Sequence, residues 1–236
     1  MMFALFSLQL KAQNRTLVGE DLRDKLQRLY KDHKVYSYYN ARKTIYNQVD
    51  CQDDKLWLEY SDYRYDWECG SSKMPPSTII NAEHTIPQSF FHKQTPMVSD
   101  MHHIFASPAK LNTARSNYPF GEWSYDDCRI WCYQQSCSSE KPSGDMTEYS
   151  CVNSNGNGFM PRAADRGRVA RAVFYFFTMY DSYDITSVGD IETLKKWNRE
   201  FPPDDREKFR NDQINQTQGN RNPFVDDYTL IDQIDW

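Results

Sequence analysis

The sequence predicts an α+β fold, in which one mainly helical domain carries a small β element and is stabilised by disulfides. Apolar residues recur at helical spacing in several segments, and the longest of these, 166–180, is apolar on nearly every face. Two short apolar runs, 79–86 and 101–106, have the length of strands. The 6 cysteines are an even number, which is typical of disulfide-bonded, exported proteins.

The first part of the chain predicts two helices. Over 20–32, the leucines at positions 22, 26 and 29 fall on one helical face. Over 40–49, Ala41, Ile45 and Val49 are spaced in the same way. We therefore expect both segments to bury one face against a core.

The middle of the chain predicts the β element. Residues 55–67 alternate aromatic with polar side chains, a pattern that favours a strand. The apolar runs 79–86 and 101–106 predict two more short strands, joined by a loop over 87–99. Proline suits the first turn of a helix, so Pro108 indicates a helix that runs to about residue 117.

The last part of the chain predicts a loop region followed by helices. Residues 121–160 are rich in Ser, Gly, Asn and Cys, which indicates loops held by disulfides. The apolar segment 166–180 predicts a buried helix. Two more helices are expected, one between Gly189 and Pro202 and a last one over 204–219, whose first two residues are aspartates.

The N-terminus resembles the end of a signal peptide. Residues 1–10 are largely apolar, and the small residue Ala12 follows. We expect residues 1–12 to be a signal-peptide remnant and residues 13–236 to form the single domain; a buried first helix is the alternative. No apolar run reaches the roughly 20 residues that a membrane-spanning helix needs, so no membrane partner is expected.

The cysteines favour an oxidising compartment. We expect Cys51 to pair with Cys69 and the four cysteines within 128–151 to pair among themselves. The alternative is a zinc site, because the spacing within 128–137 is loosely similar to that of a zinc finger, although no C-x-x-C pair is present. Together with the N-terminus, the cysteines predict a secreted or periplasmic protein.

Overall charge argues against a nucleic-acid partner, and aromatic content argues against disorder. The chain has 28 Lys and Arg against 33 Asp and Glu, a net charge of −5, whereas nucleic-acid-binding domains are usually basic. Aromatic residues make up 15% of the chain, which is far more than a disordered chain carries.

The dipeptide Glu83-His84 is the first sign of catalytic chemistry. A carboxylate offers a hard oxygen ligand for Mg²⁺ or Ca²⁺, and an imidazole is a general base that titrates near neutrality. The pair suits metal-assisted hydrolysis, in which a metal stabilises charge and the base activates water. Alone the dipeptide is a weak signal, because most such pairs lie on protein surfaces. The H-E-x-x-H motif of zinc proteases is absent.

The surrounding motifs are more specific. Segments 81–87 (NAEHTIP), 99–105 (SDMHHIF) and 114–122 (ARSNYPFGE) follow one another in an order that resembles the endonuclease I family, nucleases of the ββα-metal (His-Me finger) superfamily. Three further segments match the family: 39–42 (YNAR), 165–171 (DRGRVAR) and 218–224 (QGNRNPF). The resemblance spans about residues 20 to 226, and it implies a ββα-metal hairpin-helix core.

The resemblance also implies a site and a reaction. It makes His84 the general base that deprotonates water, and Glu83 and Asn117 the ligands of one divalent cation, Mg²⁺, whose site Mn²⁺ or Ca²⁺ can also occupy. The implied activity is a Mg²⁺-dependent endonuclease that hydrolyses the phosphodiester bonds of DNA, and also of RNA, leaving 5′-phosphate and 3′-hydroxyl ends. Recognition would be directed at the backbone with little sequence specificity, by a monomer.

Four further residues are candidates for supporting or phosphate-binding roles. Asp100 and His102, two residues apart on one strand face, could orient the site, or could form a local structural hydrogen bond. Arg115 and Ser116 precede Asn117, so they are candidate phosphate contacts or simply part of a helix surface. A basic surface around the site would offset the acidic total, and six arginines are candidates for it: Arg115, Arg162, Arg166, Arg168, Arg171 and Arg221.

One expected residue has no counterpart. Relatives in this family often carry a longer insert between the two strands, which brings an arginine near the leaving group, but residues 87–99 contain no arginine. Two alternative functions follow from the same residues. One is a substrate-restricted phosphodiesterase of the superfamily, and the other is a catalytically silent nucleic-acid-binding module, against which the intact Glu83, His84 and Asn117 argue.

Overall fold

The computed structural model describes residues 17–236, so the signal-peptide remnant expected over 1–12 lies outside the described residues. Helices and sheets are both present, which confirms the α+β class. None of the helices between residues 17 and 236 combines the length and the apolar character needed to cross a bilayer.

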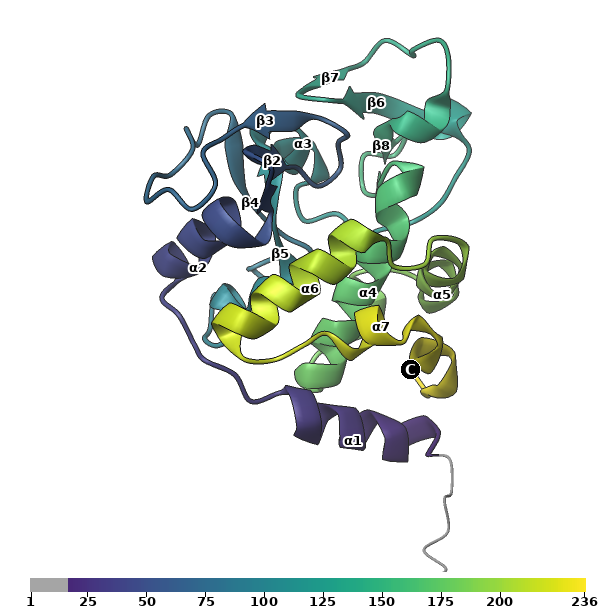
Figure 1. Ribbon diagram of the computed structural model, residues 1–236. Helices are drawn as coiled ribbons and strands as arrows, with labels where there is room; N and C mark the ends of the chain where they lie inside the picture. Colours follow the sequence, from purple (N-terminus) through teal and green to yellow (C-terminus); the bar gives the residue numbers. More distant parts are fainter. Residues whose placement is uncertain (1–16) are drawn as a thin grey trace, which may run out of the picture.

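Helix α4 (Ala163–Met179) lies at the centre of the molecule, as Figure 1 shows. Its apolar residues, among them Val173, Phe174 and Phe176, are almost completely buried, and each large side chain of this kind contributes about 1.5–3 kcal/mol by leaving water. Helices α1 (Gly19–Tyr30), α5 (Ile191–Glu200) and α7 (Pro223–Asp226) pack around it. The buried helix predicted over 166–180 is therefore confirmed.

Strands β4 (Ile80–His84) and β5 (Ile104–Pro108) form an antiparallel pair, and helix α3 (Ala109–Arg115) follows β5 directly and contacts both strands. The strand predicted over 101–106 is wrong at its start. Met101–His103 form a 3₁₀ turn, because the Asp100 carboxylate accepts a hydrogen bond from the His102 N–H and caps that turn.

Helix α3 is shorter than predicted at both ends. Pro108 closes strand β5, so the helix begins at Ala109. It ends at Arg115 because Ser116 has a φ of 54°, in the left-handed region, and turns the chain away. Asn117 therefore lies just beyond the helix rather than in its last turn.

The segment before β4 contains a helix and a small sheet. Helix α2 (Tyr38–Thr44) continues into a π-helical turn over Ile45–Val49, as predicted for 40–49. The single strand expected over 55–67 is wrong, since β1 (Cys51–Gln52), β2 (Lys55–Trp57) and β3 (Arg64–Asp66) form an antiparallel sheet. Tyr60 has a φ of 69°, which bends the chain between β2 and β3.

The region 121–160 is not a set of loops, as predicted, but a four-stranded antiparallel sheet in the order β7-β6-β8-β9. The strands are β6 (Cys128–Tyr133), β7 (Ser136–Ser138), β8 (Ser150–Asn153) and β9 (Phe159–Met160). Three of the four are shorter than five residues, too short to show a strand pattern in the sequence.

All six cysteines are in disulfides, which confirms the predicted pairing scheme. Cys51 pairs with Cys69, and the other two bonds are Cys128–Cys151 and Cys132–Cys137. No free cysteine remains in the part of the chain that the structure describes, so the alternative of a cysteine-ligated zinc site is wrong.

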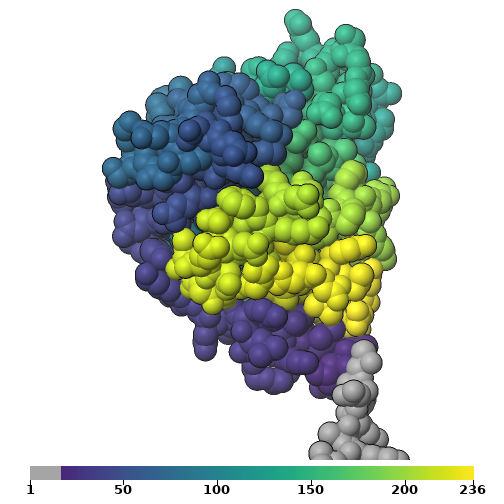
Figure 2. Space-filling view, in the orientation of Figure 1, coloured from purple at the N-terminus to yellow at the C-terminus, as the bar shows by residue number. Residues whose placement is uncertain are grey.

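Helix α6 (Asp205–Gln218) begins where the Asp204 carboxylate accepts a hydrogen bond from the Glu207 N–H, and it ends at Gly219, whose φ is 92°. The segment from α6 to the C-terminus lies across one face of the molecule, beside the N-terminal half (Figure 2). An ion pair between Arg171 of α4 and Glu207 of α6 joins the two helices.

Candidate active site

His84 is the last residue of β4, and its ring is oriented by two hydrogen bonds. Nε2 lies 3.2 Å from the carbonyl oxygen of Val98, which can only accept, so Nε2 carries the proton. Nδ1 is then unprotonated and accepts from the Gln88 side-chain amide at 3.1 Å. Burial, together with the neighbouring His103, lowers the pKa of His84 to about 3, so the imidazole is neutral at physiological pH.

Glu83 precedes His84 at the end of β4, and its side chain is almost completely buried. Its Oε1 accepts from the Tyr60 hydroxyl at 2.9 Å and lies 3.3 Å from Arg115 Nε, whereas Oε2 accepts no hydrogen bond from the described residues. Burial raises the pKa of Glu83 to about 7, although Arg115 and the Tyr60 hydroxyl oppose that shift. A divalent cation at Oε2 would favour the ionised form.

Arg115 joins the end of α3 to the end of β4. Its guanidinium donates to the backbone carbonyls of His84 and Thr85, and its side chain is only 1% exposed. The structure therefore places Arg115 in the interior, as a support for Glu83, and not on a helix surface. Asn117 follows two residues later and is exposed, with Ser116 Oγ 3.5 Å from its Oδ1.

The free carboxylate oxygen of Glu83 is, by its chemistry, a suitable ligand for a hard divalent cation. Glu83 Oε2 and the side-chain oxygen of Asn117 are both hard ligands, and Mg²⁺ usually keeps several waters and takes only one or two carboxylates. Within residues 17–236, no group of three or more His, Cys, Asp or Glu side chains is arranged to hold a metal. A cation at Glu83 would thus need water for most of its ligands.

The second acid–histidine pair lies elsewhere. Asp100 is completely buried, and its two carboxylate oxygens accept from Tyr175, Tyr180 and Gln218 as well as from the His102 N–H. The ring of His102 lies 4.5 Å from that of Tyr175, and its Nε2 donates to the Asn220 carbonyl.

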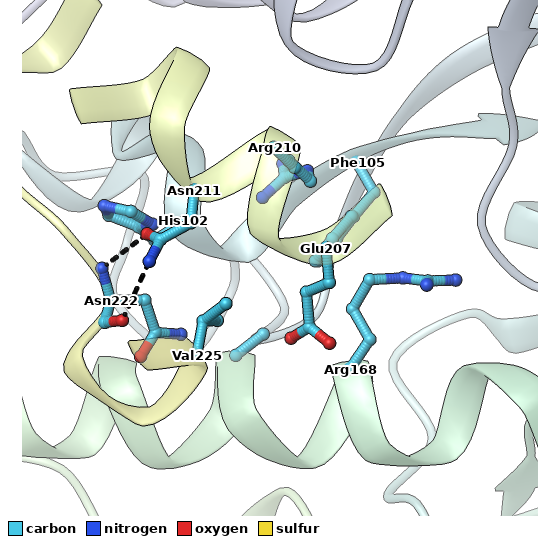
Figure 3. Close-up of a pocket in the computed structure, with 9 residues that line it drawn as sticks. His102, Phe105, Arg168, Glu207, Arg210, Asn211, Asn222 and Val225 are labelled. Atoms are coloured by element: carbon cyan, nitrogen blue, oxygen red, sulfur yellow. Dashed lines mark hydrogen bonds between the residues drawn. The ribbon is translucent and has the colours of Figure 1, made fainter. Parts of the chain in front are cut away.

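Figure 3 shows His102 beside Asn211 and Asn222, where α6 and the segment after it face α4. Neither Asp100 nor His102 makes a hydrogen bond to Glu83 or His84 in the described structure. The expectation that the two share a strand face is wrong, because both belong to the capped 3₁₀ turn.

Sequence reasoning missed the residues that hold the site together. Tyr60 binds Glu83, Gln88 binds His84, and the ring of His103 lies 5.4 Å from that of His84. The ring of Tyr38 also lies 5.4 Å from His84. Only Gln88, four residues after His84, could have been suspected from its spacing.

The six arginines proposed as a basic surface do not form one. Each is paired with a carboxylate, and most of these pairs are buried. The pairs are Arg115–Glu83, Arg162–Asp165, Arg166–Glu122, Arg168–Glu59, Arg171–Glu207 and Arg221–Asp226. The carboxylates neutralise the charges of these arginines, and several of the pairs join segments that are far apart in the chain.

Comparison with known proteins agrees with the motifs. The family model described as Endonuclease I matches residues 18–228. An extracellular deoxyribonuclease of Aeromonas hydrophila is 24% identical over 94% of this chain and 93% of the relative. An extracellular ribonuclease of Bacillus amyloliquefaciens is 27% identical over 92% of this chain and 74% of the relative.

A periplasmic deoxyribonuclease of Aeromonas hydrophila is 28% identical over 55% of this chain and 48% of the relative. These relatives are extracellular or periplasmic, which agrees with the location that the disulfides predicted. Because the family model covers nearly the whole described chain, the chain belongs to the endonuclease I family of nucleic-acid hydrolases.

Proposed function

We propose that this protein is a secreted or periplasmic, Mg²⁺-dependent endonuclease that cleaves DNA and RNA with little sequence preference, leaving 5′-phosphate and 3′-hydroxyl ends. The chain from residue 13 onward acts as one domain and as a monomer, and the β4–β5–α3 unit serves as its ββα-metal core. The observation that carries the proposal is that two neighbouring residues at the end of β4 keep the groups this chemistry needs: His84 has an unprotonated Nδ1, and Glu83 has an oxygen, Oε2, that accepts no hydrogen bond from the described residues.

His84 acts as the general base. Val98 holds the proton on Nε2, so Nδ1 has the lone pair that can take a proton from the attacking water. The Gln88 amide, which donates to Nδ1, keeps the ring in place until water enters. His103 packs against the ring and helps to keep it neutral, which is the form that accepts a proton.

Glu83 and Asn117 hold the cation. A Mg²⁺ bound there would supply positive charge to offset the charge that develops on the phosphate and on the leaving 3′-oxygen. Tyr60 and Arg115 both contact Oε1 of Glu83, so they hold the carboxylate and leave Oε2 available as a ligand. Ser116 turns the chain after α3 and so presents Asn117 at the surface.

The proposed base and cation also explain why both DNA and RNA would be substrates. A base and a cation act on the phosphodiester group, which DNA and RNA share, and phosphate contacts carry no sequence information. One relative is named a deoxyribonuclease and another a ribonuclease, and this chain matches both over most of its length.

The test is nuclease activity on plasmid DNA, single-stranded DNA and RNA, with Mg²⁺ and with chelator. We expect cleavage of all three only with Mg²⁺, and a loss of about 10²–10⁴-fold for His84→Ala. His92→Asn, a change at an exposed histidine with positive φ, is the matched control and should retain full activity. Full activity of folded His84→Ala would contradict the proposal, and cleavage of one substrate alone would favour the restricted phosphodiesterase.

A further inference from the structure

The site lacks an obvious cation from the protein for the substrate phosphate. The loop 87–99 contains no arginine, and Arg115 is buried and paired with Glu83. Phosphate recognition normally draws on arginine, whose planar guanidinium forms two parallel hydrogen bonds to a phosphate. A phosphate-binding residue of this site would therefore be an arginine near His84 that no carboxylate neutralises.

Arg42 of α2 meets that condition. Its side chain forms no ion pair or hydrogen bond with any residue that the structure describes, and its Nε is buried without a partner. An unsatisfied buried donor is unfavourable, so it is rare in proteins and calls for an explanation. The one favourable contact of the guanidinium is with the ring of Tyr38, whose centroid lies 4.7 Å from its central carbon.

That stacking contact connects Arg42 to the proposed base. The ring of Tyr38 lies 5.4 Å from that of His84, and the Gln88 amide is shared between the Tyr38 hydroxyl, at 3.4 Å, and His84 Nδ1, at 3.1 Å. Tyr38 therefore lies between the guanidinium of Arg42 and the ring of His84.

The arrangement is suited to an anion. The contact with Tyr38 holds the guanidinium, while its N–H groups donate to no residue that the structure describes. We propose that Arg42 binds a phosphate oxygen of the substrate beside His84, and so supplies the positive charge that the loop 87–99 does not provide. The identity of the anion as a nucleic-acid phosphate rests on the proposed function.

The experiment compares Arg42→Gln with Lys43→Gln, which removes one positive charge from the neighbouring residue of the same helix. Affinity for a DNA duplex is measured in chelator, so that no cleavage occurs, at several salt concentrations. For Arg42→Gln we expect the slope of log affinity against log salt to become less negative by about 0.9, the value for one lost phosphate contact. For Lys43→Gln we expect no change in slope.

Steady-state cleavage with Mg²⁺ provides the second readout. We expect Arg42→Gln to lower kcat/KM by about 10²–10³-fold, as loss of one positioned donor to a developing anion does. Arg42→Lys should keep the salt slope but recover kcat/KM only in part, because lysine cannot form two parallel hydrogen bonds. If the glutamine variant fails to fold in a thermal melt, the lysine variant carries the test, and wild-type kcat/KM for it contradicts the proposal.

The two proposals fail in different ways. In one outcome the wild-type protein cleaves DNA, but Arg42→Gln has the same salt slope and the same kcat/KM as Lys43→Gln. That outcome would overturn the role of Arg42 and leave the proposed function intact. Absence of cleavage by the wild-type protein, with the expected change in slope for Arg42→Gln, would overturn the proposed function and leave the phosphate contact intact.

Discussion

Two acid–histidine pairs, Glu83/His84 and Asp100/His102, lie close together in the sequence but differ in what their polar atoms contact. Both oxygens of Asp100 accept hydrogen bonds, and His102 Nε2 donates to a backbone carbonyl. At Glu83 one oxygen accepts no hydrogen bond from the described residues, and the proton acceptor of His84 contacts only a side-chain amide.

The difference separates a structural network from a candidate catalytic one. The partners of Asp100 come from α4 and α6, helices far apart in the sequence, so the carboxylate ties distant segments together. Glu83 instead keeps one carboxylate oxygen that accepts no hydrogen bond from the described residues, and the acceptor nitrogen of His84 is held only by the Gln88 side chain. Catalytic groups need such unused capacity, because substrate, water and cation must still bind.

The largest expected effect is on catalysis. Glu83→Gln removes the charge that we propose for binding the cation, while keeping the size of the side chain. We expect cleavage per folded molecule at saturating Mg²⁺ to fall about 10³-fold, close to 4 kcal/mol of transition-state stabilisation. Rates are measured on plasmid DNA, with the folded fraction determined by near-UV circular dichroism. Activity within threefold of the wild type would remove Glu83 from the site.

Asp100→Asn should instead act on stability. The substituted amide would place donors against the hydroxyl groups of Tyr175 and Tyr180, which now donate to the carboxylate. We expect the free energy of unfolding in urea to fall by about 3 to 5 kcal/mol, with cleavage per folded molecule retained. An unchanged urea midpoint would show that Asp100 does not tie the helices together.

The pH dependence of stability provides a third comparison. Burial lowers the pKa of His102 from 6.5 to about 4, although Asp100 opposes this shift. A histidine whose folded pKa is depressed contributes stability that is present above pH 6.5 and is lost as the pH falls toward 4. We expect His102 to account for about 3 kcal/mol of that loss, so that unfolding curves of His102→Gln vary less with pH between 6.5 and 4. If the unfolding free energy of His102→Gln varies with pH in the same way as that of the wild type, His102 is not buried in its neutral form.

The smallest expected effect is that of the cation on thermal stability. Mg²⁺ at ten times its Kd should stabilise the wild-type protein by about 1.4 kcal/mol, because it binds only the folded state. Glu83→Gln and Asn117→Ala should lose this increase in Tm, whereas Asp100→Asn should keep it. A Mg²⁺-dependent shift that survives in Asn117→Ala would place the cation away from Asn117.

Local patterns in the sequence predicted what depends on near neighbours. The helix around Phe174 and Phe176 follows from its apolar residues, and the Cys51–Cys69 bond joins cysteines close in the chain. The Glu83-His84 pair was proposed as a site because both residues lie in one ordered set of motifs, and its role stays a prediction. Its position at the end of β4 also follows from Pro87, which cannot continue the strand.

Features that depend on distant partners could not be predicted. Arg168 appears in the sequence as part of a basic helix start, but Glu59, more than a hundred residues away, neutralises it. Tyr60 gives no sign in the sequence that it contacts Glu83. The sheet within 121–160 was missed because most of its strands are too short to show a pattern, so pairing and disulfides, rather than residue pattern, define it.

The most direct test compares His84, the proposed general base, with His102, the proposed structural histidine. We would measure kcat/KM for plasmid DNA, per folded molecule and at pH 7.5, for His84→Gln and His102→Gln side by side. We expect His84→Gln to lose at least about 10²-fold and His102→Gln to stay within a few fold of the wild type. Equal losses in the two folded variants, or a fully active His84→Gln, would contradict the assignment of His84 as the base and His102 as a structural residue.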